Sequence, residues 1–504
     1  WEKTRRIERW HRDLGAGPEA RNAALSEAGL KVAWPFCVKP PDENPPVYCI
    51  VSHLTWRLGE GLLGEVAARR LSSILLFAGV AAGITLMAAK RWGTIPALMA
   101  AGAWVIHPRI FTHARVAAID MPLAAFWFFG AAACLRAGET GKRVWLVGPL
   151  LGLAVMSKFT GVLAVPALVC WLAVYARTYF WRITLVTAIL LPVTMIAAHP
   201  GWWLDPWSGI ATAIEVHKTR HLFQMVPTWY FGQVYDHSLP WHNSLVLPLV
   251  CSPPVWAGLA LAGIGCAITG GLRDRFVGWI GLNWSALIIM RATPLAPGHD
   301  GIRQLLASFP YFALLAGYGA FRLQSALPRG RQITLGLLIA GSAAGIGAWW
   351  RLRPAELSYY SEAIGGLRGA RSLGLESTYW WECADGALLL HMNKSLPEGA
   401  KIGLSSHYLQ IFGEYQRLGR LRKDMVFVPL QELAVRGPDL KPRLAPVDYL
   451  IILNREGMLK RRDRPPITPI LEELEWRLAG PAEFTVEREG VRLLALVKVT
   501  PDGK

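Results

Sequence analysis

Apolar segments recur along the chain from about residue 70 to residue 350, and a short polar connection separates each from the next. Several are shorter than the roughly 20 residues that a helix perpendicular to a bilayer needs, so their ends are placed only to within several residues. About ten membrane spans are predicted, at residues 70–89, 93–107, 120–135, 144–157, 159–176, 182–199, 246–269, 276–290, 303–322 and 333–350. This pattern is typical of a polytopic α-helical membrane protein.

The connections between these spans predict their orientation. Basic residues gather in every second connection, where Glu139 and Asp274 are the acidic residues that oppose them. The basic residues are Lys90, Arg91, Arg136, Lys142, Arg143, Arg177, Arg182, Arg273, Arg275, Arg322, Arg329 and Arg331. By the positive-inside rule these connections are cytoplasmic. Both ends of the chain and the connections at 108–119, 200–245 and 291–302 are therefore expected on the outer face of the membrane.

The two ends of the chain differ from the apolar middle. Residues 1–69 contain no apolar run long enough to span a membrane, and the stretch RRIERWHRDL predicts an amphipathic surface helix. Because residue 1 is then already outside, we expect one further span upstream. After residue 350, the segments AKIGLSS, VDYLIIL and VRLLALVKV predict short buried strands. The predicted domains are an external loop at 1–69, a transmembrane bundle at 70–350 and an extracytoplasmic α/β domain at 351–504.

Composition favours a membrane protein over a nucleic-acid-binding one. Of the 504 residues, 53% are hydrophobic and 18% charged, with a mean hydropathy of +0.29, whereas soluble domains are about 25% charged. The net charge of +17 could indicate nucleic acid, but topology accounts for basic residues in short connections and chain ends. The seven cysteines include no CxxC pair, and Cys37 and Cys49 could form a disulfide if their loop faces an oxidising compartment.

Residues that could carry chemistry all fall on the predicted outer face. In KPPDENPPVYC, two prolines that cannot lie inside a helix follow Asp42 and Glu43 and so present these carboxylates. Lys158 joins two spans, and a long outer loop holds HPGWWLDPW and PTWYFGQVYDHSLPWHN. Two further connections contribute His107, Arg109, His113, Arg115 and Asp120, and then His299, Asp300 and Arg303.

Each of these features also has a purely structural interpretation. Asp42 and Glu43 could be solvated loop charges, Arg115 could clamp Asp120, and Lys158 could reach the lipid headgroups. The aromatic residues of the long loop could form an interfacial belt. His242 and His299 lack the close spacing of metal ligands. The convergence of acids, cations and aromatic residues on one water-facing side favours a site over these separate interpretations.

Such a combination suits the transfer of a group from a lipid phosphate. A carboxylate can deprotonate or orient the acceptor, and arginine and lysine can stabilise the charge that builds on a leaving phosphate. The apolar bundle would hold the lipid chain.

Several motifs resemble those of one family of enzymes. RVAAIDMPLAAFWFF, GLAVMSKFTGVLAVP, DENPPVY and GHDGIRQLLASFPYFALLAGYG are similar, in order and spacing, to motifs of GT-C fold glycosyltransferases. The resemblance is to the dolichyl-phosphate-mannose protein mannosyltransferase type, a group that includes the bacterial aminoarabinose lipid A transferases. LSYYSEAIGG also resembles a stretch that follows the last span in bacterial members.

The resemblance implies a fold, a donor and a set of site residues. It implies a GT-C-like bundle with a C-terminal soluble α/β domain, and a polyprenyl-phosphate-linked sugar as donor, with a divalent metal possible. An acidic pair follows the first helix in the family; Glu2 could match its glutamate, and the aspartate is then replaced by Trp1 or lies upstream. Asn44 stands where the family often has Lys or His. The implied catalytic residues are Asp120, Asp42, Glu43 and Glu2; the implied substrate-binding residues are Arg115, Lys158, Arg303, His299, Asp300, Tyr230, Trp241, His242 and Asn44.

The preferred hypothesis is a membrane glycosyltransferase that moves a sugar to a protein, lipid or glycan acceptor at the outer face of a bacterial inner membrane. A catalytically degenerate GT-C-like subunit of a membrane assembly is the alternative, and the opening Trp1-Glu2 favours it. A transporter would predict inverted repeats and charges at mid-span, and the sequence shows neither.

Overall fold

The computed structural model describes residues 2–37, 44–223, 226–405, 409–436, 442–462 and 468–499. The chain divides into two compact units. The first, which we call the helical unit, comprises Trp1–Gln224, Pro240–Leu295 and Ile302–Gly345. The second, the sheet unit, comprises Met225–Leu239, Ala296–Gly301 and Ile346–Lys504. Two short loop segments thus join the C-terminal residues in one unit. The predicted three-part division remains a prediction.

Each predicted span overlaps one α-helix, except the span 246–269, which overlaps two. These helices are α4 (Val47–Trp92), α5 (Thr94–Val105), α7 (Asp120–Thr140), α8 (Val147–Ser157), α9 (Ala164–Tyr175), α10 (Phe180–Ala197), α12 (Asn243–Val250), α13 (Pro254–Ile268), α14 (Arg275–Arg291), α15 (Phe309–Ala326) and α16 (Gly330–Leu352). Within the described residues, the helices long and apolar enough to cross a membrane are Val47–Trp92, Asp120–Thr140, Arg177–Ala197 and Gly330–Leu352. The prediction of a helical bundle followed by a small α/β domain is confirmed.

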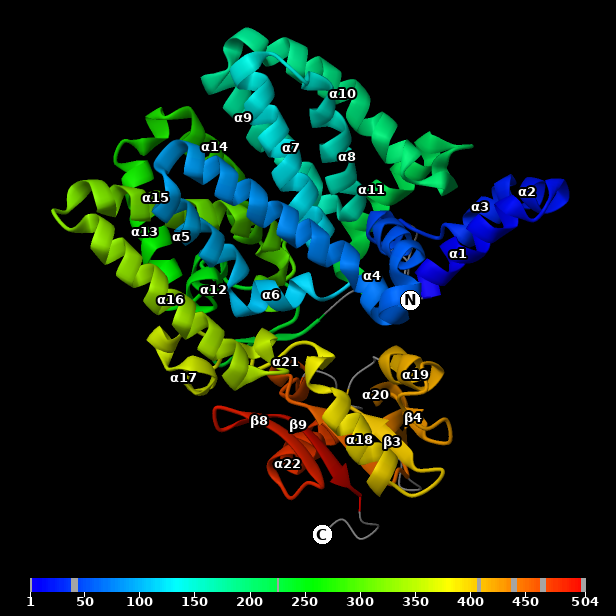
Figure 1. The fold of residues 1–504 in the computed structure, drawn as a ribbon. Coiled ribbons are helices and arrows are strands. Elements are labelled where there is room, and N and C mark those ends of the chain that lie inside the picture. Colours follow the sequence, from blue (N-terminus) through cyan, green and yellow to red (C-terminus); the bar gives the residue numbers. More distant parts are fainter. Residues whose placement is uncertain are drawn as a thin grey trace. The chain divides into compact units, whose positions relative to one another are not determined.

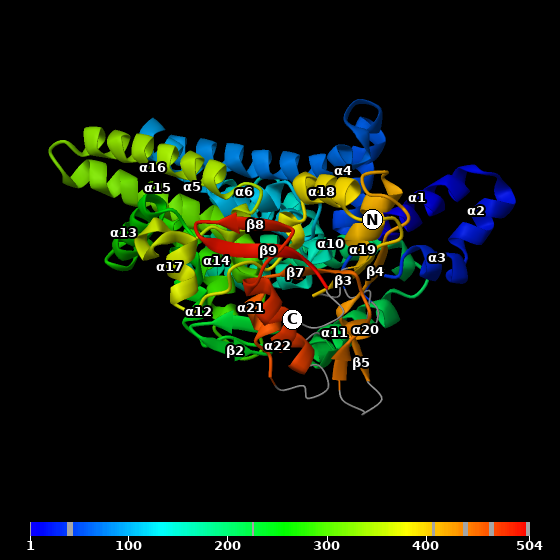
Figure 2. The ribbon, with the colours of Figure 1, turned by 90° about the horizontal axis from the view of Figure 1, so that it is seen from below.

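The helical unit is packed through small residues. A Cβ atom on Gly263 of α13 would lie 2.0 Å from the carbonyl oxygen of Leu315, and one on Gly319 of α15 would lie 2.1 Å from that of Leu259. Only glycine permits this approach, so the backbones of α13 and α15 lie directly against each other. Figures 1 and 2 show α5 beside both α4 and α15, and α5 packs against each of these two helices.

The first helices of the chain form a buried cluster with the start of α4. The first helices are α1 (Glu2–Gly15), α2 (Pro18–Leu25) and α3 (Glu27–Ala33), of which α1 and α3 contribute side chains to the cluster. The predicted amphipathic helix corresponds to α1. Cys37 and Cys49 both lie in this cluster, but they are free thiols. Both side chains are 1% exposed, and burial raises the pKa of the Cys37 thiol. The suggested disulfide between them is therefore wrong in this structure, which keeps both sulfurs in a packed apolar environment.

The sheet unit is built on a mixed five-stranded sheet with the order β4-β3-β7-β9-β8. Strands β3 (Lys401–Leu404), β4 (Val426–Val428) and β7 (Tyr449–Leu453) are parallel, and β8 (Phe484–Arg488) and β9 (Val491–Lys498) continue it antiparallel. The three strands predicted from apolar runs are thus confirmed as β3, β7 and β9. Figures 1 and 2 show α18 (Gly386–Ser395) and α22 (Thr468–Ala479) on opposite faces of this sheet.

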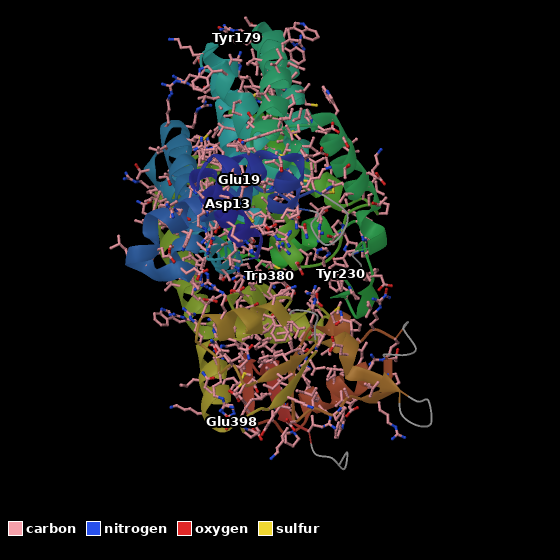
Figure 3. All side chains as sticks on the ribbon, turned by 90° about the vertical axis from the view of Figure 1, so that its right-hand side faces the viewer. Asp13, Glu19, Tyr179, Tyr230, Trp380 and Glu398 are labelled. Atoms are coloured by element: carbon pink, nitrogen blue, oxygen red, sulfur yellow. The ribbon has the colours of Figure 1, made fainter. Side chains whose placement is uncertain are left out.

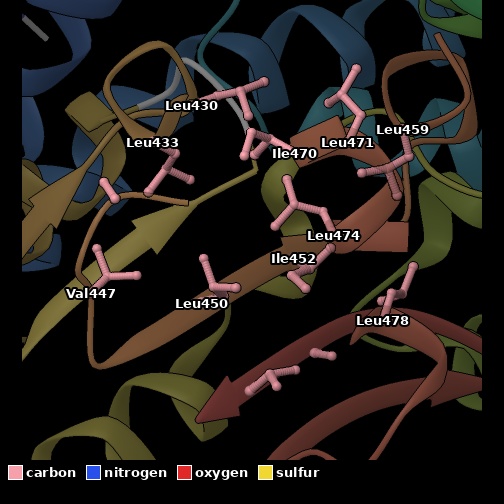
Figure 4. Close-up of a cluster of buried hydrophobic side chains, with 13 residues drawn as sticks. Leu430, Leu433, Val447, Leu450, Ile452, Leu459, Ile470, Leu471, Leu474 and Leu478 are labelled. Atoms are coloured by element: carbon pink, nitrogen blue, oxygen red, sulfur yellow. The ribbon is translucent and has the colours of Figure 1, made fainter. Parts of the chain in front are cut away.

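One face of the sheet is sealed by a leucine-rich core. Leu450 and Ile452 of β7 pack against Leu471 and Leu474 of α22, and all four side chains are buried (Figure 4). Their alternation along β7 and their spacing along α22 place them on facing surfaces. This core holds the C-terminal residues together as one unit.

Smaller elements complete the sheet unit. A hairpin is formed by β1 (Thr228–Tyr230) and β2 (Gln233–Tyr235), and a second by β5 (Ala434–Arg436) and β6 (Pro442–Leu444). The short helices are α17 (Gly366–Ser372), α19 (Leu409–Arg417), α20 (Leu430–Leu433) and α21 (Glu456–Leu459). In Figure 3, Tyr230 and Trp380 lie at one end of this unit and Glu398 at the other.

Candidate functional site

An ion-pair centre in the helical unit joins three segments that lie far apart in sequence. Asp120 begins α7, Lys158 follows α8, and Arg303 lies in the 3-10 helix η6 (Gly301–Ser308). Asp120 Oδ1 accepts a hydrogen bond from Lys158 Nζ at 3.0 Å, and Oδ2 accepts one from Arg303 Nε at 2.7 Å. Both oxygens of this carboxylate are therefore held by cations.

Local structure sets the direction of each side chain. Asp120 lies in the first turn of α7, where backbone N–H groups and the helix dipole favour a negative charge. Lys158 has an extended backbone (φ −161°, ψ 134°) between α8 and the 3-10 helix η2 (Phe159–Leu163). This break ends α8 at Lys158. Gly161 keeps the turn tight, because a Cβ there would lie 2.6 Å from the Ala154 backbone.

Gln304 is a fourth member of the centre. Its Oε1 accepts a hydrogen bond from Lys158 Nζ at 2.7 Å, so Lys158 bridges Asp120 and Gln304. Apart from its position next to Arg303, nothing in the sequence pointed to Gln304. Its acceptor oxygen orients Lys158 without adding charge.

The centre is buried and contains two cations beside one carboxylate. Asp120 is 1% exposed and Lys158 6%, and the side chain of Arg303 is 17% exposed. One carboxylate faces two cations, so these three groups together carry a formal charge of one positive unit. His113 of α6 (Pro108–Ala114) is also buried and acts electrostatically on Asp120.

Arg115 occupies a different position from the one that its spacing suggested. The sequence indicated Arg115 as the cation beside Asp120, whereas the contacts shown for Asp120 are with Lys158 and Arg303. Arg115 Nη2 donates to Thr112 Oγ1 at 3.3 Å, and its guanidinium lies over the Phe111 ring. Arg115 follows the end of α6, so its side chain turns back along that short helix.

The other predicted site residues are spread over the chain. Trp241 is 64% exposed and contacts the ring of His242, the residue before α12, and Asn44 is half-buried; all three belong to the helical unit. Tyr230, His299 and Asp300 belong to the sheet unit. Asp42 and Glu43 lie outside the described residues, as does the side chain of Glu2. In the described ranges, no three His, Cys, Asp or Glu side chains are grouped as a metal site requires.

Asp300 takes part in a second buried charge cluster, within the sheet unit. Asp300 Oδ1 accepts a hydrogen bond from Arg455 Nη2 at 3.0 Å, and the Arg455 guanidinium lies 3.7 Å from Glu376 Oε1. The neighbouring Glu456 is held by Ser377, whose backbone N–H donates to Glu456 Oε2 at 2.8 Å. Two carboxyl groups thus lie against one guanidinium, and the third, that of Glu456, acts electrostatically on Glu376. Sequence reasoning identified Asp300 but missed its partners, which lie far along the chain.

Burial determines the ionisation of this cluster. Loss of water raises the pKa of Glu376 from 4.5 to about 8; the negative charges of Glu456 and Asp300 add to the rise, and Arg455 opposes it. Burial likewise raises the pKa of Glu456, against the hydrogen bonds from Ser377. Glu376 is therefore largely protonated at neutral pH, which reduces the repulsion among the three carboxyl groups.

Part of the chain matches a known protein family. Residues 43–203 match the family described as dolichyl-phosphate-mannose-protein mannosyltransferase, over about a third of the chain. The matched segment includes Asp120 and Lys158. It confirms the resemblance to GT-C fold glycosyltransferases that the motifs indicated. None of the curated proteins matches this sequence.

Solved structures show a broad likeness. ArnT from Cupriavidus metallidurans bound to undecaprenyl phosphate is 14% identical, with a TM-score of 0.47 over 92% of this chain and 88% of that one. The structure of the same enzyme in its apo state is 15% identical in sequence, with a TM-score of 0.48 over 95% of this chain and 93% of that one. The oligosaccharyltransferase of Archaeoglobus fulgidus, in complex with Zn and sulfate, is 12% identical, with a TM-score of 0.45 over 90% of this chain and 64% of that one. TM-scores below 0.5 carry no evidence about the site.

Proposed function

We propose that this protein transfers a sugar from a polyprenyl-phosphate donor to an acceptor. The match of residues 43–203 to the dolichyl-phosphate-mannose-protein mannosyltransferase family supports this proposal. The reaction takes place at the outer face of a bacterial inner membrane. The single observation that carries the proposal is the buried centre in which Lys158 and Arg303 both contact the Asp120 carboxylate.

Lys158 and Arg303 hold the phosphate of the donor. An arginine presents several N–H donors in a plane, which matches the oxygens of a phosphate, and lysine adds a point charge. During transfer the acceptor oxygen forms a bond to the sugar anomeric carbon, and the bond from that carbon to the phosphate oxygen breaks. The two cations stabilise the negative charge that the leaving phosphate gains.

Asp120 orients these two cations in this proposal, because both of its oxygens are engaged by them. In this proposal the base that accepts the proton of the acceptor is another carboxylate, because the two cations make Asp120 a weak base. Asp42, Glu43 and Glu2 are the candidates, on the sequence argument alone.

The test is the binding of undecaprenyl phosphate to the full chain in nanodiscs. Arg303→Ala is expected to weaken binding about tenfold or more, and Arg303→Lys to restore it in part because a point charge lacks the planar fork. Arg322→Ala is the matched control, since Arg322 lies in α15 and donates to the Tyr318 hydroxyl at 3.1 Å. If a folded Arg303→Ala variant binds undecaprenyl phosphate with unchanged affinity, Arg303 does not contact the donor phosphate and serves only to orient the chain in the membrane.

A catalytically degenerate membrane subunit is the second candidate. The two ion pairs of Asp120 favour it, because they stabilise the charged carboxylate and so make it a weaker base. Such a subunit would bind undecaprenyl phosphate yet consume no undecaprenyl-phosphate-linked sugar. Sugar release or transfer in a purified sample, lost in a Glu43→Gln or an Asp42→Asn variant, would exclude this alternative.

A further inference from the structure

A cavity of about 730 Å³ lies entirely within the sheet unit. Its walls come from the β1–β2 hairpin, the end of α17, the start of α21, α22 and the β8–β9 turn. Its volume falls in the range of roughly 300–1,000 Å³ that small-molecule sites occupy. None of the residues assigned above to the phosphate centre lines it.

The hairpin that forms one wall is fixed by close backbone contacts. A Cβ on Gly374 would lie 2.2 Å from the Gly232 nitrogen, and one on Gly457 would lie 2.5 Å from the Pro227 carbonyl oxygen. The Gly232 N–H also donates to the Gly374 carbonyl at 3.1 Å. Glycines at these positions let the hairpin backbone lie directly on its neighbours, so the wall is preformed.

The turn of this hairpin carries an aromatic residue in a strained conformation. Phe231 has φ 47° and is followed by Gly232 at φ 79°. Two-residue hairpin turns of this kind normally contain Asn, Asp or Gly, because a bulky side chain is disfavoured in the left-handed region. Phe231 is nevertheless 45% exposed and lines the cavity. Strain held at an exposed ring points to a role in binding.

Trp229 adds a second aromatic surface to the same wall. It is half-buried, and Lys460 Nζ lies 4.8 Å from the centre of its ring. The ring is therefore fixed in place. Aromatic faces carry partial negative charge, and the weakly positive C–H groups of a sugar ring are suited to lie against them.

Charged groups around the cavity balance in sign. The cations are Arg371, Lys460 and Arg492, and the acids are Glu456, Glu475 and Glu487. Lys460 Nζ and Glu475 Oε1 are 3.4 Å apart. The buried amide of Asn454 donates to the Arg492 carbonyl at 2.7 Å. Equal charges give no preference for a phosphate, whereas closely spaced donors and acceptors can bind a ligand that carries many hydroxyl groups.

We propose that this cavity binds a neutral saccharide, with a sugar ring against Phe231 and Trp229 and its hydroxyls on the surrounding charged groups. If the protein is the proposed transferase, this saccharide is part of the acceptor, and that identification rests on the proposed function. The binding itself does not, because it requires neither donor nor transfer.

The test is saturation-transfer difference NMR on the full chain in detergent. The neutral probes are methyl α-mannoside and N-acetylglucosamine, and the anionic probes are glucuronic acid and inorganic phosphate, the last followed by ³¹P line broadening. Phe231→Asn removes the ring and places a residue that tolerates the left-handed conformation, so the variant is expected to fold. Trp476→Ala is the matched control, since Trp476 is 62% exposed and lies on α22 away from the cavity.

The proposal predicts that a neutral probe binds, that Phe231→Asn weakens this binding about tenfold or more, and that Trp476→Ala leaves it unchanged. Binding of the anionic probes alone, binding of no probe, or equal binding by wild type and Phe231→Asn would each overturn it. The affinity for undecaprenyl phosphate should be the same in both variants as in wild type. A failure at the phosphate centre is thereby distinguished from a failure at this cavity.

Discussion

Asp120 is the residue on which the account of the phosphate centre depends. Its carboxylate receives Lys158 and Arg303 on its two oxygens, so it sets the distance and direction of both cations. Asp120→Asn should lower sugar transfer about 100-fold, because small displacements of binding groups have effects of that size. It should also lower the free energy of unfolding by about 3–5 kcal/mol, the scale for a broken buried ion pair. Transfer assays and urea unfolding of the same preparations check both effects.

A double variant separates orientation from direct catalysis. Asp120→Asn combined with Lys158→Met removes a cation along with the carboxylate, so it should recover part of the lost stability but none of the activity. Loss of activity without loss of stability in Asp120→Asn would make Asp120 a base. Loss of stability with full activity per folded molecule would make it a clamp of the fold alone.

Glu376 gives the sheet unit a pH dependence of known sign. Its pKa is raised by burial to about 8, against an ordinary value of 4.5. Between these values the folded chain holds a proton that the unfolded chain has released. The free energy of unfolding should therefore fall as pH rises from about 4.5 to 8, by at most about 1.4 kcal/mol per pH unit.

Limited proteolysis of the sheet unit during urea unfolding, at a series of pH values, measures this dependence. Glu376→Gln mimics the protonated side chain and should flatten it over the same window. Glu398→Gln is the control, because Glu398 is an exposed carboxylate of the same unit. A wild-type stability that rises with pH in this window would mean that Arg455 dominates and keeps Glu376 ionised.

The sequence pointed to the charged members of the ion-pair centre but not to all of their contacts. Asp120, Lys158 and Arg303 stand out because ionic side chains next to apolar spans are rare. Gln304 is neutral and gives no such signal. Arg115 was matched to Asp120 through a spacing of five residues, but no helix continues between Ala114 and Asp120. Sequence distance therefore did not predict spatial distance there.

At the scale of elements, Gly64 determines the shape of α4. Its φ of 72° and ψ of 164° interrupt the helix, and this backbone region is essentially restricted to glycine. Gly64→Ala should lower the free energy of unfolding by about 1 kcal/mol or more, although a Cβ would meet no neighbouring atom. The loss arises from backbone conformation alone.

Gly61→Ala is the matched control for that change. Gly61 lies three residues earlier in α4, a Cβ added there would meet no atom within 4 Å, and the residue is not among the positive-φ glycines. Alanine should be neutral or slightly stabilising there, by up to about 1 kcal/mol. Equal effects of the two variants in a thermal unfolding assay would show that α4 needs no break at Gly64.

Element positions were largely predictable because apolar periodicity and run length follow directly from burial. The exception is the predicted span 246–269, which is two helices, α12 and α13. Pro253 and Pro254 explain this break, since proline lacks the N–H that would continue a helix. The start of α4 at Val47 lies well before the apolar run, because its first turns pack against α1 and α3.

At the scale of the whole molecule, sequence could not reveal that segments 225–239 and 296–301 belong to the sheet unit. Short loops have no periodicity that could indicate their partners. Their assignment depends on contacts such as Asp300–Arg455 and Gly232–Gly374, which link residues far apart in the chain. The cavity proposed to bind a saccharide depends on the same long-range packing.

The proposed membrane orientation predicts a labelling pattern. In a Cys170→Ser background, which removes the exposed cysteine, a cysteine at Arg329 should resist an impermeant thiol reagent in intact cells. A cysteine at Gln431 should react, because the sheet unit is proposed to lie outside. Both positions are exposed, and both should react after permeabilisation. The opposite pattern would place the phosphate centre on the cytoplasmic side.

The central claim is that Asp120, Lys158 and Arg303 form the site for the donor phosphate. Electron cryo-microscopy of the full chain in nanodiscs with undecaprenyl phosphate tests it most directly. The account predicts density for the phosphate within hydrogen-bonding distance of Lys158 Nζ and the Arg303 guanidinium, with Asp120 still in contact with both. A phosphate bound elsewhere, with Lys158 and Arg303 paired only to Asp120, would contradict it.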